Sequence, residues 1–158
     1  MHIGIIYYSV TGTTEEFASR IVNGLIKERH HVELVNIKTD VKVTGPGQGF
    51  KIMNATDCSN FDFIMFGCPV WAFSACPVII EAIKKSSGLS GKKVMPFVTM
   101  GFPFRCLGGS RAVKQIEKTA REMGADVLPG IVIPKLFHDF KALMDKAVND
   151  IIAIVKNP

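Results

Sequence analysis

Short apolar runs alternate with segments of helical periodicity along the chain. Residues 3–8 form the first apolar run, and residues 17–26 place apolar side chains three or four positions apart. This pair predicts a buried strand followed by an amphipathic helix, and the pattern recurs to the end of the chain. The predicted strands are 3–8, 32–37, 61–67, 94–99 and 127–133, and the predicted helices are 17–26, 75–85, 110–123 and 137–155.

This alternation is typical of an α/β protein with a parallel sheet and helices on both faces. Pro96 lies inside the fourth predicted strand, where its missing N–H predicts a bulge or a later strand start. Pro129 fits a strand at the edge of the sheet. Residues 38–60 are interpreted as a long irregular connection with a weak helical segment near 50–56. No linker divides the chain, so we expect one domain over residues 1–158.

Composition narrows the class of protein. The 158 residues are 47% hydrophobic and 21% charged. No apolar run approaches the roughly 20 residues of a membrane span, and no signal-peptide pattern is visible, so we expect a cytoplasmic protein without a membrane span. The net charge is +5, but basic residues are dispersed among acidic ones. This favours a mildly basic surface over nucleic-acid binding.

Cysteine and histidine spacing predicts no metal site. The cysteines match neither C-x-x-C nor a zinc pattern, so we expect free thiols that mostly serve packing. The histidines are scattered, and the adjacent pair at positions 30 and 31 falls where a helix gives way to a strand. That position favours a solvated turn. These residues are Cys58, Cys68, Cys76, Cys106, His2, His30, His31 and His138.

The first strand is followed directly by a threonine-rich loop, residues 9–14. Ligands of open parallel sheets bind at the carboxyl ends of the strands. Here backbone N–H groups, hydroxyls and a helix N-terminus can hold a phosphate without Lys or Arg. Glu15 and Glu16 favour a monophosphate over a polyphosphate. A plain helix N-cap is the alternative, but it needs only one such residue. The expected phosphate-binding residues are Ser9, Val10, Thr11, Gly12, Thr13 and Thr14.

Two more loops at strand ends have unusual compositions. Residues 67–73 end the central strand with Gly-Cys-Pro-Val-Trp-Ala-Phe, and residues 99–109 follow the fourth strand. Trp71 could stack on a flat heteroaromatic ring. The alternative is that Trp71 belongs to the core or to a dimer contact.

The hexapeptide at residues 9–14 resembles the flavodoxin phosphate loop, [ST]-x-T-G-x-T, at the end of the first strand. It has neither the Gly-Lys-Ser/Thr ending of a Walker loop nor the pattern G-x-G-x-x-G. The second loop, residues 67–73, resembles the family's second flavin loop. The third loop, residues 99–109, resembles the family's third flavin loop more loosely. The resemblance covers nearly the whole chain. It implies a flavodoxin-like three-layer sandwich, with a five-stranded parallel sheet in the order 2-1-3-4-5.

The resemblance also implies FMN as the cofactor. Trp71 would flank the flavin ring, Phe104 could cover its second face, and a carbonyl within residues 67–70 would accept a hydrogen bond from flavin N5–H. Arg105 would either stabilise the reduced flavin near N1 or face solvent. The ring-contacting residues implied in these two loops are Cys68, Pro69, Val70, Trp71, Thr99, Gly101, Phe102, Phe104 and Cys106.

Two functions remain open for such a protein. Its oligomeric state, monomer or homodimer, is also open. The first function is electron transfer between redox partner proteins, for which no catalytic residue is assigned because the loops lack a general base. The family's carriers are typically acidic, and the net charge of +5 departs from that pattern.

The second function is an NAD(P)H-dependent reductase of quinones or other small electron acceptors, with Phe73, Phe102 and Phe104 lining the substrate site. A non-redox alternative, a phosphoacceptor receiver domain, requires aspartates at the strand ends. The sequence has Tyr8-Ser9 and Gly67-Cys68 there.

Overall fold

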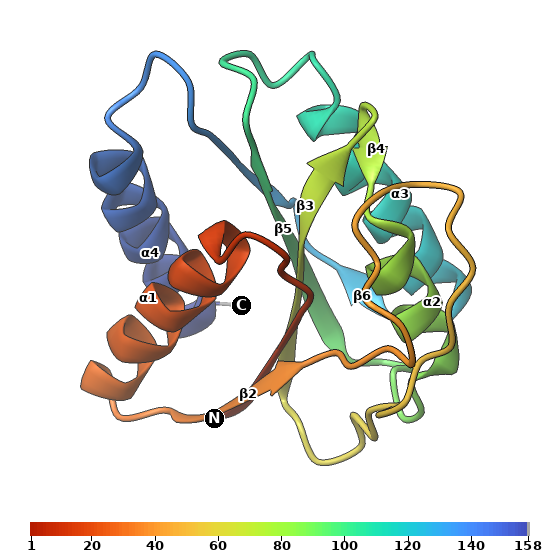
Figure 1. Cartoon of the computed structure of the whole chain (residues 1–158). Coiled ribbons are helices and arrows are strands. Elements are labelled where there is room, and N and C mark those ends of the chain that lie inside the picture. The colour runs from red at the N-terminus through yellow and green to blue at the C-terminus, as the bar shows by residue number, and fades with distance from the viewer. Residues whose placement is uncertain (158) are drawn as a thin grey trace.

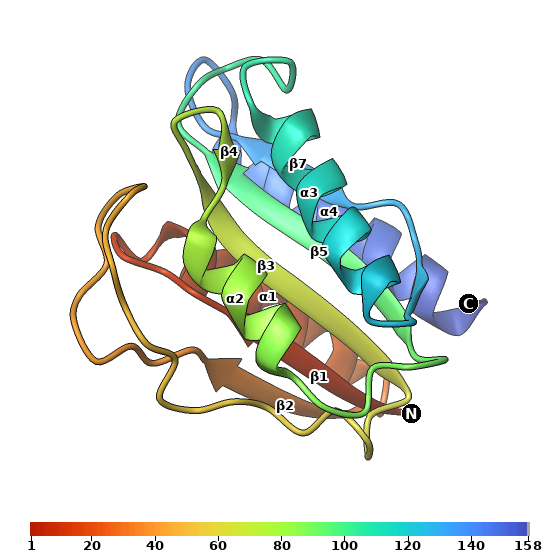
Figure 2. The same ribbon diagram turned by 90° about the vertical axis from the view of Figure 1, so that its right-hand side faces the viewer.

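In the computed structural model, which describes residues 1–157, a central sheet lies between two pairs of helices (Figure 1). Helices α1 and α4 cover one face of the sheet, and α2 and α3 cover the other (Figure 2). The elements are β1 (His2–Tyr7), α1 (Thr13–Lys27), β2 (His31–Asn36), β3 (Phe63–Trp71), β4 (Ser74–Ala75), α2 (Pro77–Lys85), β5 (Lys93–Met100), α3 (Gly109–Glu122), β6 (Asp126–Val127), β7 (Ile131–Pro134) and α4 (Phe140–Lys156).

The sheet has the strand order β2-β1-β3-β5-β6, and these neighbours pair in parallel. This confirms the predicted α/β fold and its order 2-1-3-4-5. The sheet has seven strands among the described residues, where five were expected. One addition is the two-residue strand β4, which pairs antiparallel with the end of β3.

The other addition arises because the fifth predicted strand is split. β6 pairs with Lys93 and Val94 of β5, and β7 pairs with the stretch from Phe97 to Met100. Pro96 falls between these two pairings. Its missing N–H therefore faces the gap that separates β6 from β7. β5 itself runs without interruption past Pro96 along β3. The neighbouring strand, and not β5, therefore adjusts to the proline.

The predicted helical segment at 50–56 is wrong. Residues 38–60 fold back on themselves, with an antiparallel bridge between Thr39 and Ile52. The segment 50–56 is hydrogen-bonded to residues 38–40 instead of to itself: Asp40 Oδ1 accepts from Lys51 N at 2.7 Å, Lys38 O accepts from Met53 N at 2.8 Å, and Asn54 Oδ1 accepts from Lys38 N at 2.6 Å. Such local hydrogen bonds compete with helix formation.

Two apolar layers hold the sheet between the helices. Alternate residues of β1 enter opposite layers: Ile3 and Ile5 pack with α1 and α4, and Ile6 packs with α2. β3 and β5 are buried over most of their length, as expected for central parallel strands. Among residues 1–157, no helix is long and apolar enough to cross a bilayer.

Candidate functional site

Three connections meet where β1, β3 and β5 end. Figure 1 shows the β3–β4 hairpin and the segment after β5 at this same end of the sheet. A hollow of about 250 Å³ lies between these connections. It is lined by Ser9, Val10, Thr11, Thr13, Thr14, Pro69, Val70, Trp71, Thr99, Met100, Gly101 and Lys135.

The threonine-rich loop turns sharply into α1. Gly12 caps the helix at φ 89°, a left-handed conformation that strains residues with a Cβ, and Thr13 begins the helix. Thr11 and Thr13 place their hydroxyl oxygens 3.4 Å apart. Within residues 1–157, no N–H of the segment 9–14 has a hydrogen-bond partner, so these donors are available to a ligand.

Buried hydrogen bonds support this loop from below. Thr14 Oγ1 lies 2.8 Å from Thr99 Oγ1, and both side chains are buried. Tyr7 donates its hydroxyl to Glu15 at 3.1 Å. Burial, together with this hydrogen bond and the negative charge of Glu15, raises the pKa of Tyr7 to about 12. The loop is thus tied both to the neighbouring connection after β5 and to its own strand.

The donor set fits a phosphate monoester. It offers backbone N–H groups, hydroxyls and the positive end of α1, which together bind oxyanions without a cation in the loop. Glu15 is held by Tyr7, so its carboxylate is engaged outside the loop. Lys135 supplies one positive charge on the wall of the same hollow.

The second connection is a strained hairpin. β3 continues through Trp71, and only Ala72 and Phe73 link it to β4. Both linking residues have positive φ, 46° and 61°. Two-residue hairpins require this geometry, which normally favours Gly or Asn, so Ala and Phe here carry strain. The turn projects Phe73 outward, with half of its surface exposed.

An apolar surface adjoins the first hollow. Phe73 stacks on Phe102 with ring centroids 5.7 Å apart and an interplanar angle of 9°. These two rings and Leu136 line a second hollow of about 230 Å³, which shares Val70, Met100 and Gly101 with the first. We call Phe73, Phe102 and Leu136 the aromatic rim.

Trp71 lies between the first hollow and the core. It lines the first hollow and is partly buried, and Tyr8 meets its ring edge-on at 6.2 Å. Tyr8 is itself fixed, because its hydroxyl donates to Val43 O at 2.8 Å. Packing therefore fixes Trp71 on the wall of the first hollow, where an aromatic ring can stack on a flat ligand.

The structure brings most of the predicted site residues together and leaves four residues of the predicted flavin loops outside the two hollows. Cys68 is fully buried in the core, where burial raises the pKa of its thiol well above the ordinary value. Phe104 and Cys106 are exposed and line neither hollow. Arg105 lines a different hollow, against β7 and α4. Gly12 contributes through its backbone alone.

Sequence reasoning missed Lys135, Met100 and Leu136. Lys135 and Leu136 follow β7, and their N–H groups donate to Met100 O and Gly101 O at 2.9 and 3.1 Å. The sequence held a signal for Lys135 and Leu136, because the carboxyl end of the fifth predicted strand must reach the same edge of the sheet. The prediction considered only the connections after the first, third and fourth strands.

A larger hollow of about 720 Å³ lies elsewhere, between residues 48–50 and helices α2 and α3. It contains none of the predicted site residues, and it is lined partly by paired surface charges such as Glu81. The smaller hollows hold the convergent donors and aromatic rings, so the site is placed there.

Comparison with known proteins agrees with this geometry. A family model described as Flavodoxin matches residues 42–128, more than half of the chain. The match begins after the threonine-rich loop, so the loop and the match are separate observations. A comparison with curated protein sequences finds no match.

Solved structures share the fold over their full length. Flavodoxin 2 from Bacillus cereus, in its oxidised form, has a TM-score of 0.72 and 23% identity, with 100% of both chains covered. The two-electron reduced flavodoxin of Megasphaera elsdenii has a TM-score of 0.61 and 22% identity, covering 93% of this chain and 98% of its own. At this identity the similarity establishes the fold.

A parallel sheet with a threonine-rich loop after β1 and aromatic residues near the ends of β3 and β5, together with the family match, defines an FMN-binding protein of the flavodoxin type. The chain belongs to the flavodoxin family. Its cofactor is FMN.

Proposed function

We propose that this protein carries electrons between redox partner proteins, with FMN held in the hollow described above. FMN, when bound, supplies the redox chemistry. The phosphate would be held by the N–H groups and hydroxyls of residues 9–14, and the ring by Trp71 and the connection after β5. The aromatic rim would flank the ring at the surface, where a partner can approach.

The composition of the two hollows carries this proposal. Lys135 is the only residue with an ionisable side chain among those that line them. The lining therefore offers no carboxylate, imidazole or thiol to act as a general acid or base. A carrier needs none, whereas an enzyme that activates a substrate by proton transfer does.

Charge favours an acidic partner surface. The chain has a net charge of +5, and Lys135 lies on the wall of the hollow. Opposite charges accelerate encounter and set orientation, and salt weakens the effect. We therefore expect negatively charged acceptors to react faster than positively charged ones.

A stopped-flow comparison tests the carrier function. The FMN-loaded protein, reduced with dithionite, is mixed with ferricyanide or with hexaamminecobalt(III). A carrier with this charge reduces ferricyanide at a rate that falls as salt rises and that falls further in Lys135→Gln, whereas its rate with hexaamminecobalt(III) rises with salt. Lys38→Gln, on the connection before β3, is the control and leaves the rate within about twofold. Equal salt dependence for both oxidants contradicts the charge argument.

The second candidate is the reductase of quinones or other small acceptors, favoured by the 230 Å³ hollow at the aromatic rim. An aromatic acceptor of modest size fits such an apolar recess. The discriminating assay is steady-state oxidation of NADH and NADPH by the FMN-loaded protein with a soluble quinone. Turnover well above that of free FMN identifies the reductase, and rates equal to free FMN support the carrier.

A further inference from the structure

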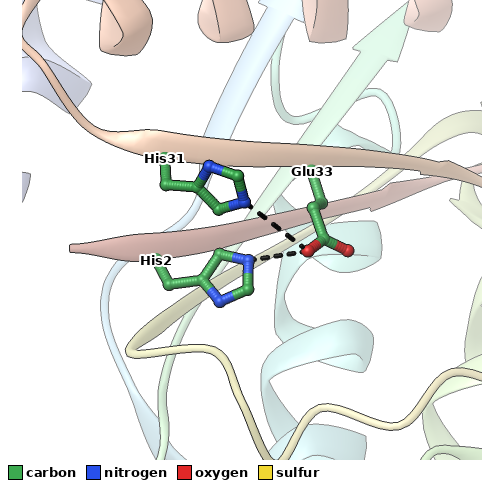
Figure 3. A group of neighbouring side chains, drawn as sticks. All are labelled: His2, His31 and Glu33. Atoms are coloured by element: carbon green, nitrogen blue, oxygen red, sulfur yellow. Dashed lines mark hydrogen bonds and ion pairs between the residues drawn. The ribbon is translucent and has the colours of Figure 1, made fainter.

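The opposite end of the sheet holds a cluster of potential metal ligands. His2, His31 and Glu33 place their ligand atoms within 4.8 Å of one another (Figure 3). The two histidines are distant in sequence, and the sequence alone gives no sign that they meet. The pairing of β1 with β2 brings them together, because it makes His2 and His31 direct neighbours.

Strand geometry explains the convergence. His2 and His31 are register partners, so their side chains leave the parallel pair on the same face. Glu33 lies two residues beyond His31 and therefore shares that face. Its Oε1 atom is 2.8 Å from His2 Nε2 and 3.8 Å from His31 Nε2. Figure 3 shows both imidazoles directed at this one carboxylate.

His2 is held firmly in this arrangement. Phe61 packs against its ring edge-on with centroids 4.9 Å apart. Its backbone N–H donates to Asp62 Oδ2 at 2.7 Å, and its carbonyl accepts from Asp62 N at 2.7 Å. One ligand is thus fixed by packing and hydrogen bonds, which reduces the loss of freedom on binding an ion.

We propose that His2, His31 and Glu33 bind a divalent transition-metal ion, with Zn²⁺ as the best match. Two imidazoles and a carboxylate are ligands that zinc accepts. Ligands about 2.0–2.1 Å from a tetrahedral zinc lie about 3.3 Å from one another, between the two observed distances. The side chains of His31 and Glu33 are 73% and 50% exposed, so water can complete the coordination.

The proposed ion would connect the edge strand β2 to β1. Strands rise about 3.3 Å per residue, so the cluster lies roughly 20 Å from the threonine-rich loop. The expected consequence is stabilisation of the native sheet by an ion that binds only the folded chain. This site is independent of FMN and of the proposed redox function.

Isothermal titration calorimetry with ZnCl₂ tests the proposal on the FMN-loaded protein. The parent for all variants is Cys106→Ser, because Cys106 is the exposed thiol and could bind zinc elsewhere. We expect one equivalent of Zn²⁺ to bind the parent, and MgCl₂ to give no saturable binding. His31→Asn and Glu33→Gln should each weaken zinc binding at least about tenfold. His30→Gln, the adjacent histidine whose ring faces the amino group of Met1, is the matched control and keeps the parent affinity.

Thermal unfolding gives a second readout. Zn²⁺ should raise the Tm of the parent and of His30→Gln, and leave that of His31→Asn unchanged. Protons compete for the imidazole nitrogens, so the zinc-dependent rise in Tm should shrink as the pH is lowered. Zinc affinity that persists in His31→Asn and Glu33→Gln overturns the proposal. Absence of saturable zinc binding to the parent also overturns it.

Discussion

The threonine-rich loop and the aromatic rim lie beside each other but are held in opposite ways. The loop rests on a buried hydrogen bond between Thr14 and Thr99, and Tyr7 holds the residue that follows it. The rim exposes half of Phe73 and of Phe102 and depends on one ring–ring stack. A preformed phosphate site gives affinity, whereas an exposed apolar rim can adapt to another surface. Under the proposed function, binding of the cofactor and contact with a partner would fall on different elements.

Gly108→Ala should have the largest effect on stability, because Gly108 lies in close contact with the backbone of the β3–β4 hairpin. A Cβ at this position would lie 2.5 Å from the Cα of Phe73, and the φ of 107° is unfavourable for alanine. Backbone strain and overpacking together predict a loss of about 2–4 kcal/mol in the free energy of unfolding. Urea denaturation measures it.

Gly101→Ala is the matched control for that change. Its Cβ meets open space and its φ is not positive, so the loss should stay within about 0.5 kcal/mol. Equal losses in the two variants would show that the hairpin and the start of α3 are not in close contact.

Thr14→Val should separate structural support from ligand contact in the loop. The change leaves the Thr99 hydroxyl buried without its partner and should lower the free energy of unfolding by about 1–3 kcal/mol. Thr11→Val removes an exposed hydroxyl, so stability should change by less than about 0.5 kcal/mol. FMN should bind about tenfold more weakly to Thr11→Val, because a hydrogen bond to a charged phosphate is lost.

Fluorescence titration with FMN and urea denaturation measure the two quantities for both threonine variants. Unchanged FMN affinity in Thr11→Val would remove this hydroxyl from the proposed phosphate site. Unchanged stability in Thr14→Val would show that the buried pair does not support the loop.

Phe102→Ala should have a smaller effect on stability. The stacked pair contributes about 0.5–1.5 kcal/mol beyond its buried area, but the rings are half exposed, so we expect a loss below about 1 kcal/mol. Phe137→Ala, at a residue that is 85% exposed, is the control and should be neutral. A loss of several kcal/mol in Phe102→Ala would contradict an adaptable rim. Chemical denaturation of both variants gives the answer.

The alkaline pH dependence of stability tests the support that Tyr7 gives to the loop. The pKa of Tyr7 is about 12 in the folded chain and near 10 when unfolded. Between these values the unfolded state holds fewer protons, so the free energy of unfolding falls as the pH rises from about 10 to 12. Tyr7→Phe should lose less stability over that range.

Denaturation at pH 9 and at pH 11 measures this difference between the parent and Tyr7→Phe. Buried thiols such as Cys58, whose pKa is raised by burial to about 11, contribute to the decline in both proteins. A parallel decline in the two proteins would show that the support from Tyr7 does not depend on its proton.

The sequence alone determined the order of strands and helices and the position of the threonine-rich loop. Both follow from local patterns: apolar periodicity fixes the elements, and a run of hydroxyl residues after a strand marks an anion site. Trp71 could be selected because it lies near the carboxyl end of a central strand. The break beside Pro96 could not be placed, because it depends on which neighbouring strand gives way.

Only the tertiary structure decided which side chains face the hollows. Cys68 is buried in the core and Phe104 lines neither hollow. Lys135, which follows β7, lines the first hollow. The same holds for His2 and His31, which become neighbours through parallel register. Strand register and the hairpin turn join residues that are distant in sequence, and side-chain direction alternates with every residue, so a shift of one position reverses the face.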